Sequence, residues 1–383
     1  MAAPVKLKPA DAAAAGQPLL SVRNLTTQIA TETGTVQAVR GISWDIYPGE
    51  ILGIVGESGS GKSVSVSSLL KLHPSPPVTI SGGPITFEGQ NLLELSERRF
   101  RRIRGRQIAM IFQDPMTSFN PVKTIGNQIS EAIRVHNRRI SRRAARARAI
   151  ELLGMVGVPR PMARYKQFPH EYSGGMRQRA MIAMAMANQP KLLIADEPTT
   201  ALDVTIQAQV LEFLKLAQQE TDAALILITH DLGLIAELAD RVLVMYAGKI
   251  VESAPVRELF RNPRHPYTVS LLESLPRIDV ETEHLATIPG SPPNLVYPPP
   301  GCAFHPRCFL SHQRERCRTE IPELVDLEVR GHTSACHFSH ELDSESAPQE
   351  DDDGDTSAVT NGDGGTQHAN TSADSEHGQE VDA

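Results

Sequence analysis

The sequence predicts an α/β protein built on a mostly parallel sheet. Short continuous apolar runs at 51–55, 191–195 and 224–229 are typical of strands buried on both faces. Helical patterns separate these runs, and strands that alternate with helices favour a parallel sheet. The 383 residues, 40% hydrophobic and 22% charged, are enough for one large or two modest globular cores.

The first part of the chain is expected to form strands. Residues 1–18 are small and Ala-rich and lack the apolar core of a secretion signal, so we expect a flexible start. Residues 19–47 show the alternation of a half-buried sheet, with Ile42, Trp44 and Ile46 on one face. The chain then turns into the first buried run, and a helix should follow the glycine-rich residues after it.

Two strongly basic segments lie at 98–106 and 134–148. The second has a helical pattern that continues through Leu152 and Val156, and the prolines of 159–169 end it. We interpret the arginines as a solvated helical face. Nucleic-acid binding is a weaker alternative, because no aromatic platform is interleaved with them, and we expect none.

The C-terminal part changes in composition near Pro276. A hairpin is predicted over 241–252, and the proline-rich residues 289–300 indicate a linker into a region with all four cysteines. The acidic tail at 341–383 contains 13 Asp and Glu and no Lys or Arg, so residues 1–340 carry +6 against −7 for the whole chain. Such a tail cannot bury enough apolar surface to fold, and we predict disorder.

No apolar stretch is long enough to span a bilayer. We therefore expect the protein to stay in the cytoplasm and to reach a membrane only through a partner.

A phosphate-binding loop is predicted directly after the strand at 51–55. Residues 56–63 fit the pattern G-x-x-x-x-G-K-S between a strand and a helix, where backbone N–H groups and the helix dipole can hold phosphates. Lys62 would reach the β- and γ-phosphates, and Ser63 would ligate Mg²⁺. The predicted nucleotide-binding residues here are Gly56, Ser58, Gly59, Ser60, Gly61, Lys62, Ser63 and Val64.

Acidic and imidazole groups follow two later strands. Asp196 and Glu197 end the run that begins at Leu192, so Asp196 is expected to bind Mg²⁺ and Glu197 to act as general base on the attacking water. His230 ends the next strand, where ligand sites of parallel sheets collect, and could contact the γ-phosphate and hold that water. In isolation this histidine would more often be structural.

Two further segments give weak signals on their own. Gln113 could reach Mg²⁺ or water, but by spacing alone a surface-loop glutamine is the better interpretation. Ser173, Gly174 and Gly175 stand before a helix and could offer N–H groups to an anion, although Ser-Gly-Gly is usually a turn.

Taken together, these segments resemble the ATPase subunits of ABC transporters over roughly residues 19–340. The resemblance rests on the order of 56–63, Gln113, 173–178, Asp196-Glu197, Thr200-Ala201-Leu202-Asp203 and His230. It implies a P-loop NTPase (RecA-like) core with an antiparallel β subdomain, an ATPase domain at 19–270 and a helical insert at about 98–172. A small Cys-rich module would follow at 271–340.

The resemblance also implies partners. In that family two subunits sandwich two ATP molecules, so Ser173–Met176 of one chain faces the phosphate loop of the other and Asp203 lies along the seam. Gln113 would couple nucleotide state to one of two membrane-spanning permeases, and an external binding protein would deliver the solute. The subunit would then sit peripherally on the cytoplasmic face of the membrane.

Finer motifs are similar to the dipeptide and oligopeptide importers. They are 56–64, 116–121, 173–179 and 265–268, and Met176 is similar to the first of the two paired ATPases, which implies a heterodimer. Nickel or another small solute is an alternative cargo, and a soluble non-transport ABC ATPase is a weaker one. One departure is that residues 26–39 offer no aromatic ring for adenine, and we expect Ile29 or Val36 to supply a plain apolar contact instead.

The cysteines form a second candidate site, with the spacing Cys302-x5-Cys308-x8-Cys317-x18-Cys336. Stable disulfides are not expected in the cytoplasm, and four thiolates suit zinc or an iron–sulfur cluster. His305, His332 and His337 lie close to the cysteines in sequence and could also ligate zinc. Unligated thiols are a third alternative. The segment 288–308 is similar to the importers' C-terminal module, which is associated with a [4Fe–4S] cluster of structural role.

Overall fold

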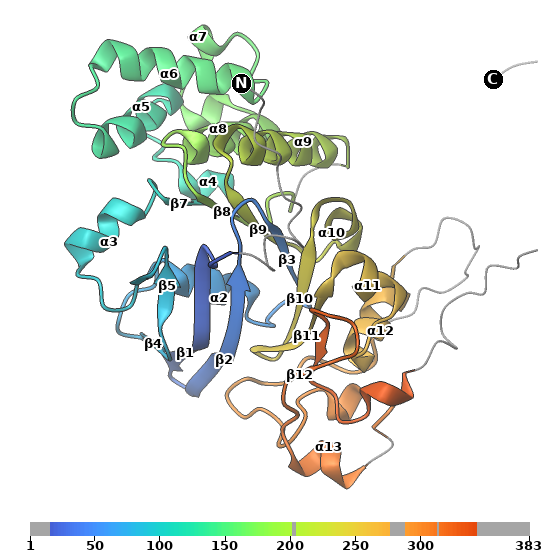
Figure 1. The fold of residues 1–383 in the computed structure, drawn as a ribbon. Helices are drawn as coiled ribbons and strands as arrows, with labels where there is room; N and C mark the ends of the chain where they lie inside the picture. The colour runs from blue at the N-terminus through green and yellow to red at the C-terminus, as the bar shows by residue number, and fades with distance from the viewer. Residues whose placement is uncertain (1–15, 201–203, 276–287, 312–313, 343–383) are drawn as a thin grey trace, which may run out of the picture. The chain divides into compact units, whose positions relative to one another are not determined.

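The computed structural model describes residues 16–200, 204–275, 288–311 and 314–342, and it contains the expected α/β core (Figure 1). The larger sheet has the order β12-β13-β11-β10-β3-β9-β8-β7. Its strands from β10 to β7 are parallel, and the other three are added antiparallel. The bounds are β3 (Ile51–Val55), β7 (Ile108–Ile111), β8 (Leu192–Asp196), β9 (Ala224–Ile228), β10 (Arg241–Tyr246), β11 (Lys249–Pro255), β12 (Val325–Asp326) and β13 (Thr333–Ser334).

The smaller sheet is antiparallel and confirms the predicted β subdomain. Its order is β2-β1-β5-β6, with β4 also paired to β1. The strands are β1 (Leu20–Thr31), β2 (Gly34–Ile46), β4 (Val78–Ser81), β5 (Ile85–Phe87) and β6 (Gln90–Asn91).

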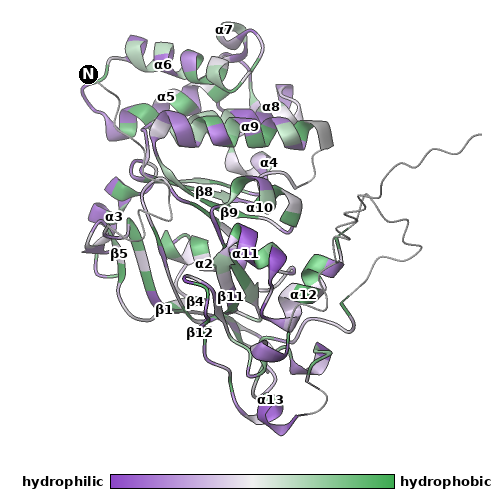
Figure 2. Cartoon of the chain, turned by 45° about the vertical axis from the view of Figure 1, so that its right-hand side comes forward, coloured by the Kyte–Doolittle hydropathy of each residue, from purple (hydrophilic) through white to green (hydrophobic). Residues whose placement is uncertain are grey.

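Some helices follow the strands of the main sheet, and others form the helical insert. They are α2 (Lys62–Leu69), α3 (Glu97–Ile103), α4 (Pro115–Ser118), α5 (Ile125–His136), α6 (Arg142–Met155), α7 (Pro161–Arg164), α8 (Gly174–Met186), α9 (Val204–Thr221), α10 (Leu232–Leu238), α11 (Val256–Arg261), α12 (Pro266–Glu273) and α13 (Glu315–Thr319). Within the described residues, 3-10 turns lie at η1 (Pro169–Glu171), η2 (His305–Arg307) and η3 (Ser339–Glu341). Helices α5, α6 and α9 carry both hydrophobic and hydrophilic residues, as expected for elements with one buried side (Figure 2).

The parallel strands are apolar throughout because both faces of the sheet are covered. Leu193 and Ala195 of β8 belong to the core that also contains residues of α5, α6 and α8. Leu192 and Ile194 of the same strand belong to the second core, which is shared with the antiparallel sheet and α2. Alternate residues therefore enter different cores, which explains why no polar residue interrupts the run.

One predicted helix is wrong in its extent. The basic residues 134–148 do not form one helix, because α5 ends at His136 and α6 begins at Arg142. Ser141 caps α6 by accepting a hydrogen bond from the N–H of Ala144, at 3.1 Å. A serine in this position stabilises a new helix start, so the arginines are divided between two elements.

The C-terminal region continues the main sheet. Strand β13 pairs with β11, and the N–H of Ala335 donates to the carbonyl of Val251 at 2.8 Å. The proline-rich segment also packs on the core, since the N–H of Gln37 in β2 donates to the carbonyl of Leu295 at 2.9 Å. In the described residues no helix is long and apolar enough to cross a membrane. The division at residue 270 stays a prediction.

Candidate functional site

The phosphate loop connects β3 to α2 and requires glycine at two places. A Cβ on Gly56 would lie 2.2 Å from the carbonyl oxygen of Met245, and one on Gly61 would lie 2.3 Å from that of Ala38. Both glycines also have positive φ, at +146° and +99°. The loop is therefore held against the ends of neighbouring strands in a conformation that other residues cannot adopt.

Lys62 begins α2 and is buried, with 4% of the residue exposed. Its Nζ donates to the carbonyl oxygens of Gly56 at 2.7 Å and Glu57 at 2.9 Å. Burial lowers the pKa of Lys62, while the carboxylates of Glu197, Asp196 and Glu57 act in the opposite direction. The ammonium group thus lies across its own loop, where a polyphosphate could replace the carbonyls as its partner.

Ser63 and Asp196 meet directly. The Ser63 hydroxyl donates to Oδ1 of Asp196 at 2.7 Å, although 133 residues separate them. They meet because β3 and β8 are parallel, lie on either side of β9 and end at the same edge of the sheet. Burial raises the pKa of Asp196, and the Ser63 hydrogen bond only partly offsets this. Two hard oxygen ligands side by side fit Mg²⁺, which takes few protein ligands and completes its shell with water and phosphate.

Glu197 lies at the centre of three polar side chains. Its Oε2 accepts from Nε2 of Gln113 at 2.9 Å and from Oγ1 of Thr200 at 3.0 Å. Nδ1 of His230 lies 3.8 Å from the same oxygen, on a side chain that is 66% exposed. The backbone of Glu197 is left-handed, with φ 45°, and its N–H donates to the carbonyl of Ile228 at 2.9 Å. The structure therefore brings Gln113 to the carboxylate of Glu197 and not to Asp196.

A cleft of about 540 Å³ joins the phosphate loop to these groups. It is lined by Ile29, Val36, Ala38, Ser58, Gly59, Gly61, Lys62, Ser63, Val64, Gln113, Glu197, His230 and Leu295. Gly56 and Ser60 shape the loop beneath it without lining it, and Asp196 is reached through Ser63. Asp203 lies outside the described residues.

The opposite end of the cleft is apolar. Ile29 and Val36, the two predicted substitutes for an aromatic ring, are register partners in β1 and β2 and both line it. Leu295 adds a third apolar side chain from the C-terminal region, and sequence reasoning missed it. An isolated leucine in a proline-rich segment carries no signal of such a role, because its position depends on a backbone hydrogen bond to Gln37.

We expect Leu295→Ala to weaken MgATP binding about 5- to 20-fold, because it removes apolar contact with the base. Affinity for tripolyphosphate, which has no base, should stay unchanged when both are measured by titration calorimetry. Leu324→Ala is a matched control, since Leu324 lies in the same region, is 40% exposed and does not line the cleft. Equal losses for ATP and tripolyphosphate would contradict the assignment of Leu295 to the base.

Ser173 caps α8 and lies at the surface, away from this cleft. Its hydroxyl accepts from the N–H of Met176 at 3.3 Å, and Ser173 and Gly174 are both exposed. Neither they nor Gly175 line the cleft that holds Lys62. The structure therefore does not bring Ser173, Gly174 and Gly175 to this chain's own phosphate loop.

The four cysteines are free thiols that lie near one another. Burial raises the pKa of Cys336 to about 12, and the charges of Cys302, Cys308 and Cys317 add to the effect. Within the described residues, however, no group of three or more His, Cys, Asp or Glu side chains is placed so that it could hold a metal ion.

The nearby histidines have other partners. Nδ1 of His305 lies 2.8 Å from the carbonyl of Cys302, Nε2 of His337 lies 3.0 Å from the carbonyl of Glu320, and the ring of buried His332 pairs with Glu252 at 2.7 Å. These contacts leave the four thiols as the remaining candidate ligands in this region.

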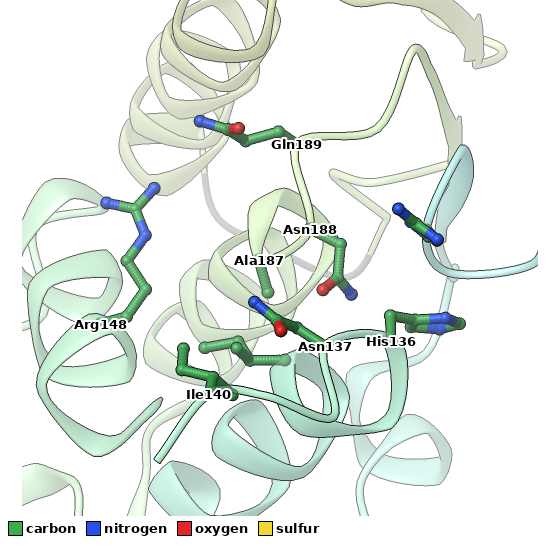
Figure 3. Close-up of a pocket in the computed structure, with 9 residues that line it drawn as sticks. His136, Asn137, Ile140, Arg148, Ala187, Asn188 and Gln189 are labelled. Atoms are coloured by element: carbon green, nitrogen blue, oxygen red, sulfur yellow. The ribbon is translucent and has the colours of Figure 1, made fainter. Parts of the chain in front are cut away.

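A second cleft, of about 560 Å³, lies between the insert and the end of α8 (Figure 3). Its lining contains His136, Asn137, Arg148 and Asn188 but no acidic side chain. Burial, helped by the charge of Arg106, lowers the pKa of His136. Without a carboxylate this cleft offers neither a Mg²⁺ ligand nor a general base for hydrolysis.

The strand–loop–helix with Lys62 and the Ser63–Asp196 contact define a P-loop nucleoside triphosphatase. Residues 39–200 match the family model "ABC transporter", and residues 251–317 match "Oligopeptide/dipeptide transporter, C-terminal region". The dimeric post-hydrolysis structure of the ATP-binding cassette MJ0796, bound to ADP and Pi, has a TM-score of 0.55 at 25% identity. The match covers 62% of this chain and 99% of the MJ0796 chain.

Two curated relatives from Bacillus subtilis are more similar. The oligopeptide transport ATP-binding protein OppD is 56% identical over 287 residues, which covers 75% of this chain and 80% of that protein. The dipeptide transport ATP-binding protein DppD is 53% identical over 290 residues, covering 76% and 86%. The chain therefore belongs to the family of ATP-binding subunits of oligopeptide and dipeptide ABC transporters.

Proposed function

We propose that this chain hydrolyses ATP to drive the import of dipeptides or oligopeptides. The observation that carries the proposal is the contact of Ser63 with Asp196 beside Glu197, at the mouth of a cleft that contains the phosphate loop. The names of the relatives support a peptide as cargo. Nickel or another small solute stays an alternative, because the permease and an external binding protein would choose it.

In this mechanism the cleft orders the triphosphate and one water molecule. Lys62 and the loop N–H groups would hold the β- and γ-phosphates, and Ser63 and Asp196 would hold Mg²⁺. Bound Mg²⁺ would neutralise charge on the phosphate oxygens. The oxygen of the water molecule bonds to the γ-phosphorus while Glu197 takes a proton from that water. The bond between the γ-phosphorus and the bridging oxygen breaks, and this oxygen leaves with ADP.

The groups around Glu197 have positioning roles. Gln113 and Thr200 hold Oε2 of the carboxylate in place, and His230, exposed beside it, holds the attacking water or the γ-phosphate. Gln113 also sits at the end of β7, next to the insert, where it can report the state of the site to a permease. The surface position of Ser173 supports a role on the ATP of a second ATPase, which we expect to be a sister chain.

The test is reconstitution with the sister ATPase and both permeases in liposomes. We expect ATP hydrolysis that rises when peptide-loaded binding protein is added outside, together with uptake of labelled peptide. Uptake of nickel instead of peptide would favour the alternative cargo. Hydrolysis that needs no permease, with no uptake of any solute, would favour a soluble ATPase.

For the four cysteines we propose a structural [4Fe–4S] cluster, with zinc as the alternative. The support is four neighbouring thiols whose histidine neighbours are already engaged. Protein purified without oxygen should contain iron and sulfide and should absorb visible light. Colourless protein with zinc would support the alternative, and colourless protein without metal would support unligated thiols.

A further inference from the structure

Arg307, in the C-terminal region, reaches the phosphate loop. Its Nη1 and Nη2 donate to Oε2 and Oε1 of Glu57 at 2.6 and 3.0 Å, across 250 residues of sequence. The arginine side chain is 5% exposed and the glutamate side chain 25% exposed. Glu57 is the second residue of the loop that wraps the phosphates, so a partly buried two-point ion pair ties that loop to the distant region.

Every N–H donor of this guanidinium has an acceptor. Besides the two oxygens of Glu57, Nη1 donates to the Tyr246 hydroxyl at 3.3 Å. Nε donates to the carbonyl of Pro289 at 2.8 Å, and Nη2 to that of Ile288 at 3.4 Å. Five bonds use all five donors of an arginine, which fixes the direction of its fork. Lysine could not reproduce this arrangement.

Glu57 is held by its backbone as well. Its N–H donates to the hydroxyl of Tyr267 in α12 at 2.7 Å, and its carbonyl accepts from Nζ of Lys62 at 2.9 Å. The rings of Tyr246, Tyr267 and Phe304 pack on one another beside Arg307, with centroids 4.6 to 5.3 Å apart. Glu57 is therefore held by two residues that follow β9, Tyr267 and Arg307, and by Lys62 of its own loop.

We propose that Arg307 is a positioning residue for the ATP site, which holds the phosphate loop through Glu57 so that Lys62 and the loop N–H groups meet the phosphates. The proposal rests on this chain binding ATP and does not depend on the cargo. Arg307 directly precedes Cys308, so a change in the conformation of the cysteine region would also affect the phosphate loop through this side chain.

The experiment measures MgATP affinity of the full-length chain by calorimetry. We expect Arg307→Met to raise Kd about 10- to 100-fold, because small misplacement of binding groups has effects of that order. Arg307→Lys should restore only part of the affinity, since a point charge replaces the fork. The double variant with Glu57→Gln should be no weaker than Arg307→Met alone, which would show that the two residues act as one unit.

Two readouts separate positioning from general stability. With the sister ATPase present, KM for ATP should rise while kcat at saturation changes less than about twofold, because the pair does not touch the attacking water. Amide exchange should quicken within residues 56–62. The matched control is Arg314→Met, since Arg314 makes a two-point pair with Glu341 in the same region, at 2.9 and 2.8 Å, away from the loop.

Equal Kd values for Arg307→Met, Arg314→Met and the unmodified chain would overturn the proposal. If Arg307→Met fails to fold, Glu57→Gln decides alone, and an unchanged Kd for that variant would equally overturn it. Failure of the unmodified chain to bind MgATP would instead contradict the proposed function, so the two failures can be distinguished.

Discussion

Replacing Glu197 by glutamine should lower kcat for ATP hydrolysis by about 10²- to 10⁴-fold, the usual contribution of a general base. Glutamine has nearly the same shape and can still accept from Gln113 and Thr200, but it cannot take a proton. Binding should persist, because Lys62 and Ser63 are unchanged. We therefore expect the variant to accumulate as an ATP-bound, closed dimer with its sister ATPase, which light scattering with MgATP can detect.

The control for this prediction is Glu237→Gln, because Glu237 is an exposed acid on α10 that pairs with Lys215 away from the cleft. Its turnover should equal that of the unmodified protein. Wild-type turnover in Glu197→Gln would show that another group, or the phosphate itself, accepts the proton. Loss of MgATP binding in that variant would show that Glu197 holds the nucleotide and not the water.

Asp196→Asn should abolish Mg²⁺-dependent hydrolysis, with a loss of about 10³-fold or more, and should also stabilise the empty protein at neutral pH. Burial raises the pKa of Asp196 above its ordinary 3.8, so the folded chain holds this proton more tightly than the unfolded chain does. The corresponding stability is present below the unfolded pKa and is lost as the pH rises through the folded pKa. Asparagine does not ionise, so the variant does not lose this stability at neutral pH.

We expect Tm of the empty Asp196→Asn variant to exceed that of the parent by about 2–4 °C at pH 7, a shift that corresponds to roughly 1 kcal/mol. The difference should shrink as the pH approaches 3.8. Asp240→Asn is the matched control, because burial also raises the pKa of Asp240, whose carboxylate accepts from the N–H of Ile51 far from Ser63. It should leave the Mg²⁺ dependence unchanged. A fall in Tm for Asp196→Asn would contradict the argument.

The central sheet and the phosphate half of the site could be predicted from the sequence for a physical reason. Strands covered on both faces must be apolar throughout, so β3, β8 and β9 are visible as continuous runs. Parallel strands end at one edge, so Ser63, Asp196 and His230 can be placed near one another from their positions after those runs. Their roles in catalysis stay predictions.

The rest depended on contacts between distant segments. Nothing in the local pattern distinguishes Leu295 from other leucines, or Arg307 from the many surface arginines, because the partners of both lie about 250 residues earlier. Residues 134–148 form parts of two helices because Ser141 caps the second one. The repeated arginines on both sides of Ser141 made the segment look like one continuous helix.

The left-handed backbone of Glu197 has a consequence for protein engineering. A residue with a side chain pays of order 1 kcal/mol to adopt that conformation, and glycine does not. A search for thermostable variants would therefore be drawn to this position and would return folded, more heat-resistant proteins without their base. Stability and turnover conflict at one peptide unit, so selections on this family should score hydrolysis and melting together.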